Sequence, residues 1–327
     1  MNYRKFGRIG WDVSEISFGA WAVGGEWGTV DDGQSIAAMK RALELGVNFF
    51  DTADVYGDGR SERLLRRLRK ETKTPFHIAT KAGRRLQPHV AAGYNKENLT
   101  AFIERSLQNI GVESLELVQL HCPPTDSYYR PETFAIMDDL VKSGKVRHYG
   151  ASVERVEEGL KAMEFPNVES IQIIFNMFRQ RPAQHFLAEA KRRGVATIIR
   201  VPLASGMLTG KLTAASTFEA SDHRNFNRHG EAFDAGETFA GVPYEIGLKA
   251  VEELKSLVPA GATLAQLALR WILMFDGVAT IIPGGKNARQ VEDNTGASAL
   301  PALTEEQMKV VRSVYDRHIR SSVHQRW

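Results

Sequence analysis

The chain has 327 residues, of which 43% are hydrophobic, and its 42 basic and 39 acidic residues leave a net charge of +3. This hydrophobic content supports a large buried core and excludes a disordered chain. The one basic cluster, residues 60–70 (RSERLLRRLRK), carries leucines at helical spacing and predicts a solvated helix face, so no nucleic-acid partner is expected.

The single cysteine, Cys122, excludes an internal disulfide and a four-thiol metal site, and no metal is expected. The first residues, MNYRKFGRIG, lack the apolar core of a signal peptide, and no apolar run reaches the roughly 18 residues of a membrane span. We therefore expect a cytoplasmic protein without a membrane partner; its oligomeric state stays open.

From residue 14 onward, short apolar runs alternate with amphipathic stretches. The apolar runs predict strands at 15–19, 47–52, 76–80, 115–120, 146–151, 170–174, 195–200 and 278–282. The stretches between them predict helices at 32–45, 61–71, 96–110, 131–143, 153–163, 182–193, 263–275 and 287–294. Asn95, Pro131 and Thr263 are typical helix-start residues. A hairpin at 2–13, an insertion at 204–258 that ends in a helix at 244–257, and a final helix at 304–318 complete the chain.

Strands that alternate with helices are typical of an α/β protein, either a parallel barrel or a doubly wound sheet. A doubly wound sheet that binds a dinucleotide would be expected to carry GxGxxG at an early turn, and this motif is absent. The sequence therefore favours a (β/α)8 TIM barrel with an N-terminal β-hairpin, a long loop plus helix after the seventh strand and a C-terminal extra helix. We expect one domain over residues 1–327.

Four polar residues lie at the ends of consecutive predicted strands, where catalytic groups of barrels gather. Asp51 ends the second strand, Tyr56 follows in its loop, Lys81 follows the third strand and His121 follows the fourth. Each alone has an ordinary structural explanation, such as helix capping. Together on adjacent strands they predict a catalytic site.

The segments that carry these residues, FFDTADVYGDGRSE, ATKAG and LVQLHCPP, resemble the three signature segments of the aldo-keto reductase superfamily, in the same order. Further similar segments are SEISFGAW, YGAS, QIIFN, VPLASGMLTGK and IIPGGKNARQVEDN, so the resemblance runs from Tyr3 to the final helix. It implies an NADPH-dependent oxidoreductase that reduces aldehydes or ketones, including sugars.

The four residues also suit this chemistry by themselves. Carbonyl reduction needs a hydride at carbon and a proton at oxygen, and a free tyrosine, with a pKa of about 10, is a weak acid near neutrality. We expect the Lys81 ammonium to lower the pKa of Tyr56, the proton donor, and Asp51 to hold Lys81 in place. His121 is expected to donate a hydrogen bond to the carbonyl oxygen.

The resemblance implies cofactor contacts at further strand ends. Ser152 and Gln172 match positions that bind the nicotinamide carboxamide, and Phe175 matches an aromatic residue that stacks on the nicotinamide ring. Matches to the pyrophosphate loop are Leu203, Ser205, Gly206, Leu208 and Lys211, and matches to the adenosine segment are Gly284, Lys286, Arg289, Gln290 and Asn294. The basic Lys286 and Arg289 favour NADPH over NADH. The chain departs from the family at Val153, where asparagine is frequent, and at Phe175, where tyrosine is frequent.

Aromatic residues on predicted rim loops, Trp21, Trp27 and Tyr128, are expected to line the substrate pocket, which would admit many carbonyls without choosing among them. Two alternatives remain open. The same residues serve an NADP+-dependent sugar or alcohol dehydrogenase that works in the oxidative direction. The regulatory β-subunits of potassium channels share this fold and these four residues, so a cofactor-sensing subunit is the alternative of another class.

Overall fold

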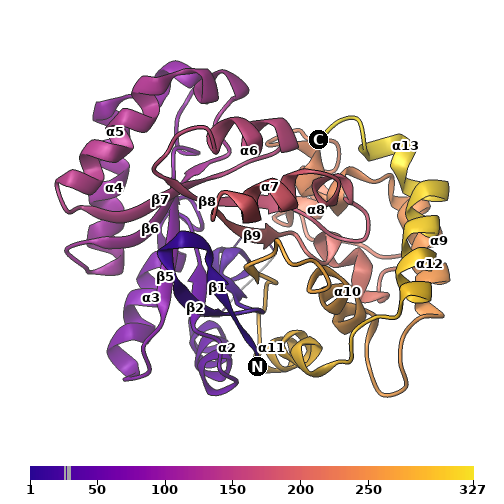
Figure 1. Cartoon of the computed structure of the whole chain (residues 1–327). Helices are drawn as coiled ribbons and strands as arrows, with labels where there is room; N and C mark the ends of the chain where they lie inside the picture. The colour runs from indigo at the N-terminus through magenta and orange to yellow at the C-terminus, as the bar shows by residue number, and fades with distance from the viewer. Residues whose placement is uncertain (26, 28–30) are drawn as a thin grey trace.

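The computed structural model describes residues 1–25, 27 and 31–327, and its central feature is a sheet of eight parallel strands (Figure 1). These are β3 (Phe18–Gly19), β4 (Phe49–Asp51), β5 (His77–Ala82), β6 (Leu115–His121), β7 (Val146–Ser152), β8 (Val168–Ile174), β9 (Ala196–Arg200) and β10 (Thr280–Ile281). Each strand pairs in parallel with the next in sequence. The two ends meet through parallel bridges of Ile16 with Ile281 and Gly19 with Gly284. The sheet is therefore the predicted barrel.

The predicted strands all appear, but the first, second and last are shorter than expected, and β4 covers three of the six residues predicted at 47–52. β3 covers two of the five residues predicted at 15–19, and β10 covers two of the five predicted at 278–282. The backbone nitrogen of Ser17 still donates to the carbonyl of Ile281 at 2.8 Å, and that of Ile281 to Glu15 at 3.0 Å. The closing seam thus consists of single bridges and hydrogen bonds rather than a regular ladder.

Eight helices alternate with the barrel strands, as predicted. They are α2 (Asp32–Glu44), α3 (Arg60–Glu71), α4 (Lys96–Ile110), α5 (Pro131–Lys142), α6 (Val156–Ala162), α7 (Phe186–Arg192), α10 (Leu264–Ile272) and α11 (Ala288–Gly296). The side chains of Asn95 and Thr263 accept backbone N–H groups at the starts of α4 and α10. Helix α6 begins later than predicted because Glu158 accepts the backbone N–H groups of Glu154 and Arg155, which form a capping turn.

The basic cluster at residues 60–70 forms α3, as its leucine spacing predicts. Leu64, Leu65 and Leu68 are buried. On the outer face, Arg67 pairs with Glu71 at 2.7 Å, so part of the basic charge is balanced within the helix.

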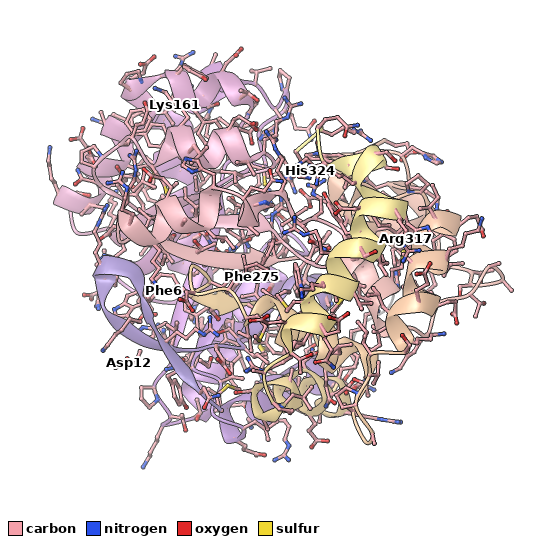
Figure 2. All side chains as sticks on the ribbon, turned by 45° about the vertical axis from the view of Figure 1, so that its right-hand side comes forward. Phe6, Asp12, Lys161, Phe275, Arg317 and His324 are labelled. Atoms are coloured by element: carbon pink, nitrogen blue, oxygen red, sulfur yellow. The ribbon has the colours of Figure 1, made fainter. Side chains whose placement is uncertain are left out.

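The predicted N-terminal hairpin is present as β1 (Tyr3–Phe6) and β2 (Trp11–Ser14), paired antiparallel. Phe6, labelled in Figure 2, and Val13 share a buried cluster with strand residues such as Phe49, Leu117 and Ile198. The hairpin therefore extends the packed core inside the barrel.

The segment after β9 has more structure than the single predicted helix. It contains η5 (Ala204–Thr209), α8 (His223–Phe226), η6 (Ala235–Glu237), η7 (Phe239–Gly241) and α9 (Tyr244–Lys255). The predicted final helix appears as α12 (Glu305–Val314), which continues through a π-helical turn, η9 (Tyr315–Ile319), into α13 (Arg320–Val323). Arg317, labelled in Figure 2, joins η9 to α9 through Glu253 at 2.7 Å.

The remaining short elements are α1 (Trp21–Gly24), η1 (Gly7–Ile9), η2 (Ala91–Gly93), η3 (Thr125–Tyr129), η4 (Arg181–Ala183) and η8 (Ala297–Ala299). None of the helices in the described part of the chain combines the length and hydropathy that crossing a bilayer requires.

Candidate active site

The predicted catalytic residues come together at the carboxyl ends of β4, β5 and β6. The ammonium nitrogen of Lys81 donates to Asp51 Oδ1 at 2.5 Å, to the backbone oxygen of Thr52 at 2.8 Å and to the Tyr56 hydroxyl at 3.3 Å. Lys81 and Asp51 are 1% and 2% exposed, so this cation depends on protein partners rather than on water. Its three donors each have an acceptor.

The second oxygen of Asp51 accepts two amide groups from inside the barrel. Gln172 Nε2 donates to Asp51 Oδ2 at 2.7 Å, and Gln119 Nε2 donates to the same atom at 3.2 Å. Gln172 was predicted as a carboxamide contact and here also holds the Asp51 carboxylate. Gln119 was not predicted, although it lies two residues before His121 on β6 and so shares its inward face.

Burial and charge together keep Tyr56 protonated. The pKa of Tyr56 lies well above its usual value, because burial and then the carboxylates of Asp51 and Glu237 disfavour the phenolate. Burial likewise lowers the pKa of Lys81. The Lys81 ammonium lies 3.3 Å from the Tyr56 hydroxyl, but burial and the two carboxylates outweigh it, so the pKa of Tyr56 is raised overall and not lowered as expected. Tyr56 remains a phenol that can donate a proton.

His121 lies edge-on to Tyr56, with ring centroids 5.8 Å apart. Its pKa is well below the usual value because of burial and then the cations of Arg84 and Lys81. The imidazole is therefore neutral at neutral pH and has one N–H to donate. Its Nδ1 atom is buried without a hydrogen-bond partner among the described residues.

A cavity of about 380 Å³ opens beside these residues. Its wall includes Asp51, Tyr56 and His121. The predicted substrate-pocket residues Trp21 and Trp27 also line it. From the predicted cofactor set it contains Gln172, Leu203, Ser205, Gly206, Lys211, Gly284, Lys286, Gln290 and Asn294.

The wall fits a dinucleotide cofactor. Gly206 adopts φ +94°, a conformation that favours glycine, and presents backbone without a side chain at the cavity. Lys211 and Lys286 add positive charge for phosphate groups, and Arg224, which was not predicted, lines the same wall. Burial lowers the pKa of Lys286, whose ammonium contacts the backbone oxygen of Trp27.

Five predicted contact residues do not reach this wall. Phe175 is fully buried between Trp271 and Phe275, with ring centroids 5.1 and 4.9 Å away. It follows β8 with the opposite parity to the inward-facing Gln172, so it points outward to the helices. Its predicted stacking on nicotinamide does not fit this position.

The other four predicted contact residues are either buried in the core or exposed on the surface, away from the cavity. Ser152, Leu208 and Tyr128 are fully buried, and the Tyr128 hydroxyl donates to the Ser152 backbone oxygen at 3.4 Å. Tyr128 is therefore a core residue and not a substrate-pocket residue. Arg289 is exposed and does not line the cavity, so of the two basic residues predicted in the adenosine segment only Lys286 does.

A charge network that the sequence did not reveal stands beside the four predicted catalytic residues; Arg200 and Glu237 are buried, and Arg84 and Glu154 are partly exposed. Arg84 pairs with Glu237 at 2.6 Å and with Glu154 at 3.1 Å. Arg200 pairs with Glu154 at 2.7 Å and lies 3.4 Å from Glu237. Arg200 and Glu237 line the cavity. The signal available in the sequence was Arg200 at the end of a strand, the position that Asp51 and His121 also occupy.

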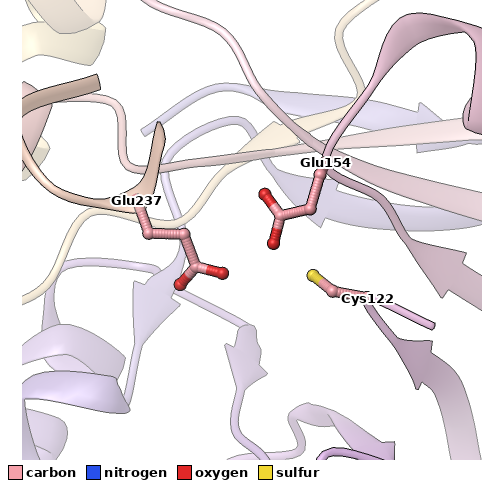
Figure 3. A group of neighbouring side chains, drawn as sticks. All are labelled: Cys122, Glu154 and Glu237. Atoms are coloured by element: carbon pink, nitrogen blue, oxygen red, sulfur yellow. The ribbon is translucent and has the colours of Figure 1, made fainter. Parts of the chain in front are cut away.

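Burial disfavours the charged form of both carboxylates of this network, but the neighbouring arginines outweigh it only at Glu237. Burial raises the pKa of Glu154 to about 7, whereas the cations of Arg84 and Arg200 hold the pKa of Glu237 well below its usual range. Figure 3 shows Glu154, Glu237 and Cys122 facing one another. Their possible ligand atoms all lie within 4.8 Å of one another. Both carboxylates are already paired with arginines, and burial raises the pKa of the Cys122 thiol, so we assign no metal to this group.

Comparisons with known proteins agree with this geometry. The Aldo/keto reductase family model matches residues 15–316. Aldo-keto reductase YhdN of Bacillus subtilis is 29% identical over 89% of this chain and 87% of its own length. A probable voltage-gated potassium channel subunit beta of Oryza sativa is 26% identical over 96% of both chains.

Solved structures of the same fold are also similar. The glycerol dehydrogenase AKR11B4 of Gluconobacter oxydans has a TM-score of 0.78 at 26% identity and covers 97% of this chain and 96% of its own. An aldo/keto reductase of Klebsiella pneumoniae, solved in complex with NADP and acetate, has a TM-score of 0.71 at 19% identity over 96% of both chains.

Proposed function

Because this chain belongs to the aldo/keto reductase family, whose members are NAD(P)H-dependent oxidoreductases, we propose that it reduces small aldehydes and ketones to alcohols with NADPH. The observation that carries the proposal is the buried contact series from Asp51 through Lys81 to the Tyr56 hydroxyl, at 2.5 and 3.3 Å, on a cavity that His121 also lines.

Tyr56 supplies the proton in this proposal. Its hydroxyl is a neutral acid on the cavity wall, and Lys81 lies close enough to stabilise negative charge as the proton leaves. Asp51 fixes the Lys81 ammonium and is itself fixed by Gln119 and Gln172. His121 is a neutral hydrogen-bond donor for the carbonyl oxygen, where negative charge develops during reduction.

NADPH would supply the hydride when bound. The residues that would hold it are those of the cavity wall beyond the four catalytic residues: Gln172, Leu203, Ser205, Gly206, Lys211, Gly284, Lys286, Gln290 and Asn294. Lys286 supports NADPH over NADH, because a half-buried ammonium is suited to the additional phosphate. The tryptophans 21 and 27 would contact the substrate.

The experiment that tests this function is a panel of aldehydes and ketones with NADPH or NADH, and of the matching alcohols with NADP+ or NAD+. We expect NADPH-dependent turnover of several aldehydes. If the protein oxidises the alcohols but does not reduce the aldehydes or ketones, it is an oxidative dehydrogenase and not a reductase. The likeness to a probable potassium channel subunit beta supports a cofactor-sensing role only if NADPH binds and no carbonyl in the panel reacts.

We also infer that residues 1–327 form one domain. The buried hydrophobic cluster that surrounds the barrel runs from Ile16 to Trp327, and it includes residues of the 204–258 segment and of the last helices.

A further inference from the structure

Glu237 reaches the active site from a segment far from the barrel strands in sequence. Its carboxylate pairs with Arg84 at 2.6 Å, and it lines the cavity together with Arg200. Its backbone oxygen accepts the hydroxyl of Ser205 at 3.0 Å, and the same hydroxyl accepts the backbone N–H of Phe239 at 3.1 Å. The conformation of residues 234–241 therefore decides where one charged part of the cavity wall lies.

Asp234 fixes this conformation at its start. One oxygen, Asp234 Oδ1, accepts the backbone N–H of Gly236 at 2.7 Å and the indole N–H of Trp327 at 2.8 Å. The backbone oxygen of Asp234 accepts the N–H of Glu237 at 3.0 Å. Trp327 is thus joined to the turn that presents Glu237, although the two residues are 90 positions apart in the sequence.

Two cations lie against the ring of Trp327. The guanidinium carbons of Arg179 and Arg326 lie 4.0 and 4.1 Å from its centroid. Arg179 is 4% exposed, and its guanidinium donates to the backbone oxygen of Ala240 at 3.5 Å. Burial lowers its pKa to about 9. The aromatic face of Trp327 is a favourable partner for this buried cation.

The backbone of the turn at residues 234–241 is strained, so its conformation depends on contacts with other parts of the chain. Phe239 and Ala240 have φ of 51° and 59°, values that residues with a Cβ rarely adopt. Gly241 follows with φ 76°, and a Cβ there would lie 2.5 Å from the Trp327 ring. The indole of Trp327 therefore packs directly against the backbone of the turn at Gly241.

We propose that Trp327 is a positioning residue for the substrate end of the cavity: through Asp234 it fixes the turn that carries Glu237 to Arg84 and Arg200. The proposal rests on the proposed reductase function. The charged wall keeps its shape only while the indole N–H and the ring hold the turn. Loss of that hold disorders the pairing of Glu237 and widens the part of the wall that contacts the substrate, while the segment that carries Lys286 stays in place.

The main test compares Trp327→Phe, which keeps a ring but removes the indole N–H, with Trp11→Phe, the same substitution at the barrel's hairpin end. Steady-state kinetics with NADPH and DL-glyceraldehyde should show KM for the aldehyde raised about five-fold or more in Trp327→Phe, the size expected for one lost hydrogen bond. We expect kcat and the Kd for NADPH to change less than two-fold, and Trp11→Phe to leave all three near wild type.

Asp234 variants separate the hydrogen bond from general packing. Asp234→Asn retains an oxygen that can accept the indole and should keep KM near wild type, whereas Asp234→Ala should reproduce Trp327→Phe. Hydrogen exchange gives a readout without turnover: the amides of Gly236 to Phe239 should exchange faster in Trp327→Phe and Asp234→Ala.

The outcomes distinguish the two proposals. A wild-type protein that reduces no carbonyl overturns the proposed function, and the exchange experiment still tests the hold on the turn. A wild-type reductase whose Trp327→Phe variant loses only thermal stability, with unchanged KM and unchanged exchange at residues 236–239, overturns the positioning role.

Discussion

The ammonium nitrogen of Lys81 lies 2.5 Å from Oδ1 of Asp51, and both side chains are almost completely buried. Such a pair is costly to break, because either partner alone would be an uncompensated charge in a dry site, typically at a cost of about 3–5 kcal/mol. The pair has little net charge toward its neighbours. The ammonium lies 3.3 Å from the Tyr56 hydroxyl, but burial affects the pKa of Tyr56 more strongly than this cation does.

Replacing Tyr56 by phenylalanine should remove the proton donor and leave the fold intact, because the ring also packs against Trp21 at a centroid distance of 6.0 Å. We expect kcat for aldehydes to fall by about 10²-fold or more, as is typical for loss of a general acid. NADPH affinity, measured by quenching of protein fluorescence, should stay near wild type. Retention of most of the activity would show that another group donates the proton.

The pH dependence should move in opposite directions in two variants of the ion pair. The Asp51 carboxylate raises the pKa of Tyr56, so Asp51→Asn should lower that pKa and shift the alkaline limb of the kcat profile to lower pH. Lys81→Met leaves the carboxylate unpaired beside Tyr56 and should raise the pKa further. Both variants should be slower than wild type. Profiles recorded from neutral to alkaline pH check the signs, and a shift in the same direction in both variants would contradict this account.

Cofactor preference should depend on Lys286 and not on Arg289, since only Lys286 lines the cavity. Lys286→Met should weaken NADPH binding by roughly 10- to 150-fold, the range for one lost charge-assisted contact, and leave NADH binding nearly unchanged. Arg289→Met, three residues away on the exposed side of α11, is the matched control and should bind both cofactors as wild type does. Equal loss of NADPH and NADH affinity in Lys286→Met would show that Lys286 only shapes the loop.

Asp54 should make the protein less stable as pH rises toward neutrality. Both of its carboxylate oxygens are buried without a hydrogen-bond partner among the described residues. Burial and then Glu62 raise its pKa from 3.8 to about 7, against the opposing cations Arg85 and Arg105. The folded state therefore favours the protonated form, and this contribution is complete below pH 3.8 and lost as pH rises through about 7.

Asp54→Asn removes this ionisation and should raise the free energy of unfolding at pH values above 7, by at most about 4 kcal/mol for a shift of this size. The gain should shrink toward acidic pH. Denaturant unfolding at several pH values measures it, and Asp126→Asn, at an exposed position, is the control. A gain of the same size at all pH values would argue for improved packing instead of a removed charge.

The sequence by itself determined the barrel and placed the four predicted catalytic residues at the ends of its strands. Parallel strands present their carboxyl ends at one edge, so Asp51, Lys81 and His121, each at such an end, had to meet once the alternation of strands and helices was recognised. Local signals also determined helix starts, as Asn95 and Thr263 illustrate.

Only the tertiary structure decided which of the other predicted residues line the cavity and which charged groups pair with one another. Phe175 lies outside the barrel because strand parity, counted from Gln172, turns it outward. Glu237 meets Arg84 from 153 positions away, and Trp327 meets Asp234 from 93 positions away, distances over which no local pattern operates. The pKa of Tyr56 depends on how completely the surrounding chain excludes water. Residues from many segments surround Tyr56 in the folded protein, so no single segment of the sequence predicts this effect.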